Sequence, residues 1–106
     1  MKRKLSLQSL AVVKYMLERP KEDVFGLELI EAVQLPAGTI YPILTRLEEA
    51  GWVEGEWESM DRKDAGRRRR KYYKLTKDGK VDGRKQLKES LKMLERMGLF
   101  TDKKKK

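Results

Sequence analysis

The sequence contains no cysteine and no histidine. A chain without thiols forms no disulfide, thiolate zinc site or cysteine nucleophile, and a chain without imidazole lacks the commonest metal ligand and general base. We therefore predict that the protein is not an enzyme and that it has no catalytic residue, no metal site and no cofactor. The function classes that remain are those that bind a partner.

Long hydrophobic runs are also missing. No apolar stretch approaches the roughly 20 residues that a membrane-spanning helix needs. The Met-Lys-Arg-Lys start leads into a short, interrupted apolar segment without a small-residue cleavage site. We predict a cytoplasmic protein without membrane attachment, and its 106 residues suffice for one small domain.

The positive charge is concentrated in the second part of the chain. Residues 1–61 carry 7 Lys and Arg against 11 Asp and Glu, a net charge of −4, whereas residues 62–106 carry 19 against 6, a net charge of +13. A surface of this kind suits a polyanion, and nucleic acid is the usual one. The alternative is a solvated, lysine-rich surface that binds nothing specific.

Two short amphipathic helices are predicted in the first third of the chain. Apolar residues recur at the helical period over residues 7–18, where Ser6 is suited to cap the first turn and Pro20 follows the last. A second run covers residues 25–33, with Asp23 as its predicted N-cap.

A third helix is predicted to end at Gly51, because glycine is the commonest residue just past a helix end. Its start depends on Pro42, since proline lacks an N–H and is unstrained only in the first turn. A start with Thr39 as the N-cap leaves Pro42 unstrained, whereas a start near Ala37 predicts a bend there. The buried side of this helix is predicted to consist of Ile40, Ile43, Leu44 and Leu47.

Alternating residues predict a β-hairpin after the third helix. Residues 52–58 and 69–75 favour strands, and the polar residues 59–66 between them favour a turn or loop. A last helix is predicted from its N-cap Thr76 to Met97, with two glycines that weaken its first turns.

This order of three helices, a hairpin and a further helix predicts a winged helix-turn-helix, a mainly α-helical fold with a small β-hairpin. We divide the chain into a DNA-binding domain over residues 1–78, a helix for dimerisation over residues 79–100 and a disordered basic tail over residues 101–106. Four apolar residues of the last helix are predicted to meet the same residues of a second chain: Leu87, Leu91, Leu94 and Met97.

The side of the third helix opposite its apolar face is small and polar near its N-terminus. Such a face can enter the major groove, roughly 12 Å wide, because no bulky side chain holds the helix away from the base edges. The predicted base contacts are Thr39, Tyr41, Thr45 and Arg46, and the predicted backbone contacts are Gly38 and Pro42. The alternative is that Gly38 and Pro42 shape a turn and that Tyr41 packs on the hairpin.

Five consecutive cations stand where the hairpin enters its second strand. Guanidinium groups at this place can neutralise phosphates or enter the minor groove. The alternative is an edge strand that is kept charged against aggregation. The predicted backbone contacts here are Arg67, Arg68, Arg69, Arg70 and Lys71.

The two tryptophans and an acidic row are less informative. Trp52 is predicted to lie in the core, whereas Trp57 fits either the core or a stacking platform. Glu54, Glu56 and Glu58 share one face of the predicted strand, which is weak support for a divalent cation site.

Two motifs resemble the PadR family of transcriptional regulators, over roughly residues 7–79. The first is Gly38-Thr39-Ile40-Tyr41-Pro42, followed by Leu44, Arg46-Leu47-Glu48 and Gly51-Trp52-Val53. The second is Arg69-Arg70-Lys71-Tyr72-Tyr73-Lys74-Leu75-Thr76 with Gly79. The resemblance implies a dimeric winged-helix DNA binder, usually a repressor, whose C-terminal helix dimerises and whose activity can be lifted by a small molecule of unknown identity.

The sequence departs from the family pattern in three places. Pro36-Ala37 replaces the usual Ser-Pro, and residues 25–29 lack the usual histidine and tyrosine. The short C-terminal part resembles the compact members with one helix after the wing.

We therefore predict a sequence-specific regulator that binds double-stranded DNA as a homodimer on a pseudo-palindromic operator. One rival is a protein-interaction module with a non-specific basic surface, which a steep salt dependence of duplex binding would exclude. A second rival, RNA binding, is disfavoured by the lack of exposed aromatic positions where stacking requires them.

Overall fold

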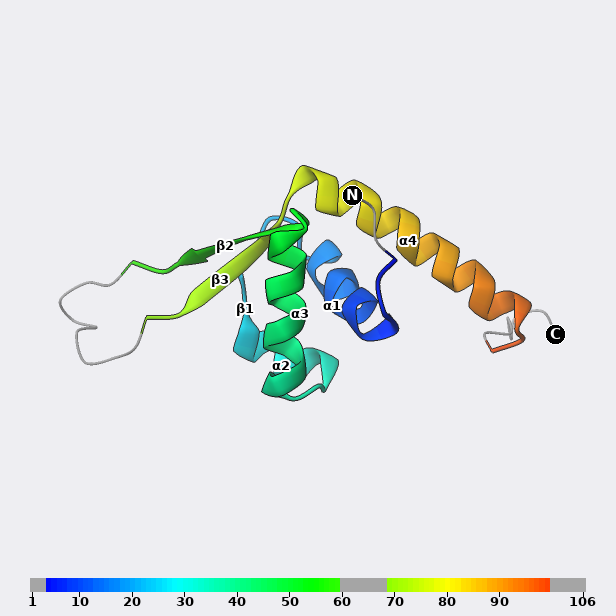
Figure 1. Cartoon of the computed structure of the whole chain (residues 1–106), viewed down its shortest axis with the longest axis horizontal. Helices are drawn as coiled ribbons and strands as arrows, with labels where there is room; N and C mark the ends of the chain where they lie inside the picture. The colour runs from blue at the N-terminus through cyan, green and yellow to red at the C-terminus, as the bar shows by residue number, and fades with distance from the viewer. Residues whose placement is uncertain (1–3, 60–68, 100–106) are drawn as a thin grey trace.

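The computed structural model describes residues 4–59 and 69–99, and these form the predicted winged helix-turn-helix (Figure 1). A short strand that the sequence analysis did not predict joins the hairpin to make a three-stranded antiparallel sheet in the order β1-β3-β2. The elements are α1 (Leu7–Leu17), β1 (Val24–Phe25), α2 (Gly26–Val33), α3 (Ala37–Glu49), β2 (Val53–Trp57), β3 (Lys71–Leu75) and α4 (Lys77–Arg96).

Local signals place both ends of most helices correctly. The side chain of Ser6 accepts a hydrogen bond from the N–H of Ser9, which confirms the predicted cap of α1. Thr76 caps α4 in the same way through the N–H of Gly79. Gly51 follows α3 with a φ of +80°, and the N–H of Trp52 reaches back to the carbonyl of Leu47 at 2.9 Å, as a Schellman motif requires.

The predicted start of α2 was wrong. Val24 and Phe25 form β1, which pairs with Tyr73 and Tyr72 of β3, and α2 begins only at Gly26. Phe25 occupies the N-cap position, and the carboxylate of Glu28 accepts its backbone N–H at 3.3 Å. A strand of two residues is too short to show an alternation of apolar and polar residues in the sequence, so only its pairing with β3 identifies it as a strand.

Asp23 therefore does not cap this helix. Its carboxylate lies 3.5 Å from Nζ of Lys74 on β3, which ties the start of β1 to the central strand. This pairing joins residues that the chain separates widely, so no local pattern predicts it.

The start of α3 agrees with the earlier of the two predicted positions. The helix begins at Ala37 with Pro36 as N-cap, and it runs through Pro42 to Glu49. Since Pro42 has no N–H, the carbonyl of Gly38 loses its partner four residues on. A bend at Pro42 stays a prediction.

The core lies between the three N-terminal helices and the inner face of the sheet. Trp52 belongs to it with 3% of its surface exposed, which confirms its predicted position. The predicted apolar face of α3 is confirmed as well, since all four residues are buried. The buried cluster consists of Val12, Val13, Met16, Val24, Leu29, Ile40, Ile43, Leu44, Leu47, Trp52, Val53, Tyr73 and Leu75.

The last helix, α4, leaves the rest of the molecule along its length. Its first half packs against α1, and its second half extends past the other helices, so the chain is 59 Å long but only 25 Å thick (Figure 1). In the described ranges, no helix is long and apolar enough to cross a membrane.

Candidate nucleic-acid interface

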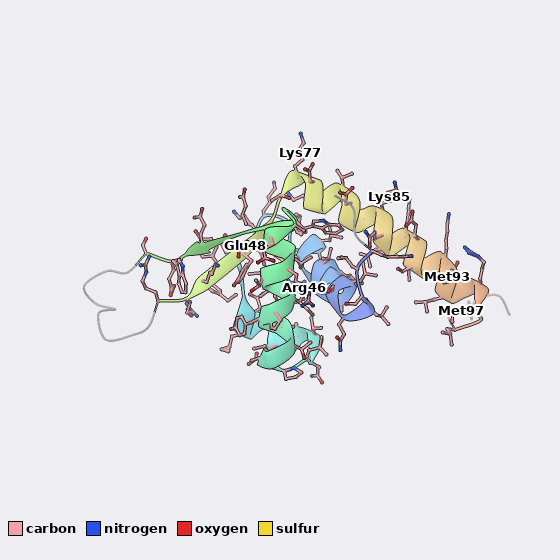
Figure 2. All side chains as sticks on the ribbon, viewed as in Figure 1. Arg46, Glu48, Lys77, Lys85, Met93 and Met97 are labelled. Carbon is pink, nitrogen blue, oxygen red and sulfur yellow. The ribbon has the colours of Figure 1, made fainter. Side chains whose placement is uncertain are left out.

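The outward arc of α3 is exposed as predicted. Gly38, Pro42 and Thr45 lie at the surface, on the side opposite the buried residues of this helix. Arg46 is exposed on one flank of the arc, and Figure 2 shows it on the opposite side of α3 from Glu48. Of the predicted base contacts, Tyr41, Thr45 and Arg46 are exposed, whereas Thr39 is half-buried.

Tyr41 has one side against the protein and one side open. It is 43% exposed, and its ring covers Gly26 at the start of α2 so closely that a Cβ added at Gly26 would lie 2.4 Å from the ring atom Cε1. A larger residue at this position would displace the tyrosine ring. The ring thus packs on Gly26, and its other side stays exposed.

Thr45 does not offer a free hydroxyl donor at the surface of α3. Its hydroxyl donates to the backbone carbonyl of Tyr41 at 3.0 Å, so the proton is already used inside the helix. What remains for a ligand is the methyl group and the acceptor lone pairs of the oxygen. A methyl-to-methyl contact with thymine fits this arrangement better than donation to a base.

The cations at the loop end of the hairpin strands are held by nearby acids. Nζ of Lys71 lies 3.2 Å from a carboxylate oxygen of Glu48, which joins β3 to the flank of α3. Nε of Arg70 lies 3.2 Å from Glu58, and Nε of Arg69 donates to the Glu58 carbonyl at 3.0 Å. Lys71 thus faces α3, whereas the guanidinium of Arg70 lies over the ring of Phe25 in β1, 4.4 Å from its centroid. Arg69 and Arg70 remain exposed.

The predicted second strand is shorter at its start than expected. It begins at Lys71, so Arg69 and Arg70 precede it, although the backbone N–H of Glu58 still donates to the carbonyl of Arg70 at 2.9 Å. Arg67 and Arg68 lie outside the described residues, as do most of the predicted loop and the basic tail.

A cleft of about 320 Å³ separates the start of α2 and Tyr41 from the loop end of the hairpin strands. Trp57, which the sequence left open, lines this cleft with 56% of its surface exposed, directly opposite Lys71 in the strand register. Leu27 lines it as well and is 59% exposed. The full lining is Phe25, Gly26, Leu27, Tyr41, Trp57, Arg69, Arg70, Lys71 and Tyr73.

Sequence reasoning missed Phe25 and Leu27 and did not decide Trp57. Alternation from Val53 places Trp57 on the inner face of the hairpin, but the strand extends past the core before it reaches this residue. The cleft thus combines apolar and aromatic walls with a row of cations, which suits a ligand that carries both apolar surface and negative charge.

The acidic row does not form a cation site. Glu56 accepts the hydroxyl of Tyr72 at 3.3 Å, and Glu58 is engaged by Arg70. Partial burial and the adjacent Glu56 carboxylate raise the pKa of the Tyr72 hydroxyl, which stays a neutral donor. Among the residues whose positions are given, no three acidic side chains come together as a metal site would require.

The predicted apolar row of α4 is exposed only in its far half. Leu87 and Leu94 are half-buried, whereas Leu91 and Met97 are exposed. The sequence analysis missed three further exposed apolar residues at this end of the molecule: Leu7, Met93 and Leu99. Figure 2 shows Met93 and Met97 at the end of α4 that lies farthest from the sheet.

The model of the PadR-like transcriptional regulator family matches residues 17–89, well over half of the chain. The chain belongs to the PadR-like family. This confirms the resemblance carried by the two motifs, both of which lie inside the matched range. No protein with a curated description matches the sequence.

Two solved PadR structures are similar to this PadR-like chain along most of its length. A PadR family transcription regulator from hypervirulent Clostridium difficile is 26% identical with a TM-score of 0.71, over 88% of this chain and 96% of that one. A PadR family regulator from Eggerthella lenta is also 26% identical with a TM-score of 0.69, over 87% of this chain and 82% of that one.

A more distant structure shares the fold alone. MepR, a transcription regulator of the Staphylococcus aureus multidrug efflux pump MepA, is 15% identical with a TM-score of 0.67, over 95% of this chain and 69% of that one. A variant of MepR has been solved bound to an oligodeoxyribonucleotide.

Proposed function

We propose that this PadR-like protein is a sequence-specific regulator that binds double-stranded DNA in the cytoplasm as a homodimer and represses transcription. The observation that carries the proposal is the exposed arc of α3 beside a cleft that Arg69, Arg70 and Lys71 line from the hairpin. Gly38 and Pro42 are exposed on this arc and carry no long side chain, so the helix can approach the base edges closely.

Sequence would be read by the exposed residues of α3. Thr45 offers its methyl group to a thymine, and Arg46 can reach a guanine edge or the adjoining phosphate. Thr39 is half-buried on the same flank as Arg46 and can contact a neighbouring base. Tyr41, supported by Gly26, offers a hydroxyl to a phosphate or a base.

The DNA backbone would lie in the cleft between Tyr41 and the hairpin. If α3 enters the major groove and the hairpin reaches the adjacent minor groove, the strand that separates the two grooves passes between them. Its phosphates then meet Arg70 and Lys71, and its sugars meet the apolar face of Trp57. Such contacts position the protein on the duplex without selecting a sequence.

The far half of α4 would pair with the same helix of a second chain. Leu91, Leu94 and Met97, spaced three residues apart, continue the apolar side of α4 past the point where α1 covers it. A two-fold dimer would place two recognition helices about one DNA turn apart, roughly 34 Å, on a pseudo-palindromic operator.

The salt dependence of duplex binding tests the proposal. If Arg70 and Lys71 of each protomer neutralise one phosphate each, four phosphates give a slope of about −3.6 in log K against log salt. Fluorescence anisotropy with a labelled duplex between low and physiological salt measures this slope. A slope shallower than about −1, or no binding, would refute the proposal and favour a protein-interaction module.

A further inference from the structure

Trp52 stands where the ends of four elements meet. It follows the C-terminus of α3, precedes β2, and its backbone carbonyl accepts the N–H of Thr76, which links β3 to α4, at 2.9 Å. With its ring buried and its N–H bonded to Leu47 of α3, Trp52 has a fixed position relative to the recognition helix.

The side chain of Thr76 connects the two helices directly. Its hydroxyl donates to the carbonyl of Gly51, just past the end of α3, at 2.7 Å, and it lies 3.2 Å from the carbonyl of Trp52. The same oxygen accepts the N–H of Gly79 in the first turn of α4 at 2.9 Å. One side chain therefore bonds to the end of α3 and to the beginning of α4.

Two glycines let α4 lie directly on this junction. A Cβ added at Gly79 would be 2.1 Å from the carbonyl oxygen of Trp52, which is backbone and cannot rotate away. A Cβ added at Gly83 would be 2.8 Å from Cγ1 of Val13 on α1. The glycines that were expected only to weaken α4 thus serve a close approach, and any larger residue would push the helix outward.

We propose that this junction, formed by Gly51, Trp52, Thr76 and Gly79, sets the separation of the two recognition helices and thereby the operator half-site spacing that the protein accepts. The inference rests on the proposed function, because it requires a dimer held together through α4. It assigns a positioning role to motif residues that the DNA-reading surface does not use.

The length of α4 explains why the junction must be stiff. About 20 residues separate Thr76 from the dimer surface near Met97, which gives a lever of about 30 Å at 1.5 Å per residue, and the packing of Gly83 on Val13 of α1 holds its first half together with the junction. A tilt of about 10° at the junction displaces the far end of such a lever by about 5 Å, more than the roughly 3.4 Å between successive base pairs. A dimer that accepts only one half-site spacing therefore requires the angle between α4 and the recognition helix to be fixed to within a few degrees.

A distance measurement between the two recognition helices tests this role. Because the chain has no cysteine, Glu49→Cys on the exposed side of α3 provides one spin-label site in each protomer. Pulsed electron paramagnetic resonance on the full-length dimer then gives the distribution of distances between the two labels. The same proteins without the label site are used to select bound sequences from a random duplex pool, which gives the half-site spacing.

Two substitutions at Thr76 separate helix capping from the junction. Thr76→Asp keeps an oxygen for the N–H of Gly79, since aspartate is a good N-cap, but it has no proton to donate to the carbonyl of Gly51. Thr76→Ser keeps both contacts and is the matched control. Ser6→Ala, which removes the cap of α1 instead, controls for general loss of stability.

We expect Thr76→Asp to widen the distance distribution at least twofold and to select the same half-sites at several spacings. Thr76→Ser and Ser6→Ala are expected to keep one narrow distribution and one spacing. Equally narrow distributions in all variants would overturn the inference and leave the proposed function intact. A monomer in sedimentation, with no dipolar signal, would overturn the dimer and this inference together. If Thr76→Asp does not fold, Gly79→Ala, which keeps Thr76 but places a methyl group against the carbonyl of Trp52, is measured in its place against the same outcomes.

Discussion

Replacing Glu48 by glutamine should strengthen DNA binding, although the substitution breaks an ion pair. In the free protein the Glu48 carboxylate, on the flank of α3, lies 3.2 Å from Nζ of Lys71, which lines the cleft. A phosphate bound to the same amine would lie within about 6 Å of the carboxylate and would be repelled by it. Glu48→Gln removes this repulsion and frees Lys71 for the phosphate.

The size of the effect follows from this distance. Two unit charges about 6 Å apart repel by about 0.7 kcal/mol in bulk water and by about 3 kcal/mol at an effective dielectric constant of 20. Both side chains are about one-third exposed, at 36% for Glu48 and 29% for Lys71, so the lower part of this range applies. We expect a gain of about 1 kcal/mol, which is about fivefold in affinity, and a salt slope steeper by up to about 0.9.

Fluorescence anisotropy on one random duplex at several salt concentrations measures both quantities. Glu18→Gln is the matched control, because Glu18 forms an exposed ion pair with Lys14 on α1 and its loss changes the net charge equally. The gain should be absent from this control. Equal affinities for Glu48→Gln and Glu18→Gln would refute the argument that the DNA backbone passes beside Lys71.

Four further results are expected. Thr45→Ala should cost about 1 to 3 kcal/mol on the operator and little on random DNA, and an unchanged ratio in competition titrations would exclude Thr45 from base reading. Iodide should quench the fluorescence of exposed Trp57 but not of buried Trp52, and DNA should protect Trp57; quenching that DNA leaves unchanged would place the backbone elsewhere. Leu91→Glu should give monomers by sedimentation at tens of micromolar while the thermal midpoint changes little, whereas an intact dimer would contradict pairing through α4. The hydrogen bond to Glu28 raises the pKa of the Tyr15 hydroxyl in the folded protein. The stability that this hydrogen bond contributes is therefore present below the unfolded pKa of about 10, and it is lost as the pH rises through the higher folded-state pKa. Denaturant midpoints should therefore fall less between neutral and strongly alkaline pH in Tyr15→Phe than in the unmodified protein, and parallel curves would contradict this.

The sequence alone determines the helices and their order, because the signals involved are local. Ser6 and Thr76 cap helices through N–H groups three residues away, and Gly51 and Gly98 end helices because their positive φ suits glycine. The apolar period of α3 likewise determines which side of that helix is buried. Such features depend on neighbours within one or two turns, so a reader of the sequence can find them.

The family motifs determine the function class but not the contacts that serve it. Resemblance identifies the PadR-like family correctly, and the charge pattern points to a polyanion. Neither observation predicts that Lys71 is paired with Glu48, or that the hydroxyl of Thr45 is already bonded within α3. These contacts alter which groups are free to meet DNA.

Only the tertiary structure decides the roles of Phe25, Trp57 and Gly79. Phe25 lies in a strand because β3 supplies its partner, and Trp57 is exposed because the hairpin extends past the core. Gly79 is required because the carbonyl of Trp52, 27 residues earlier in the chain, occupies the space of a side chain. In each case the deciding neighbour is remote in the sequence, and local propensity carries no information about a contact that exists only after the chain has folded.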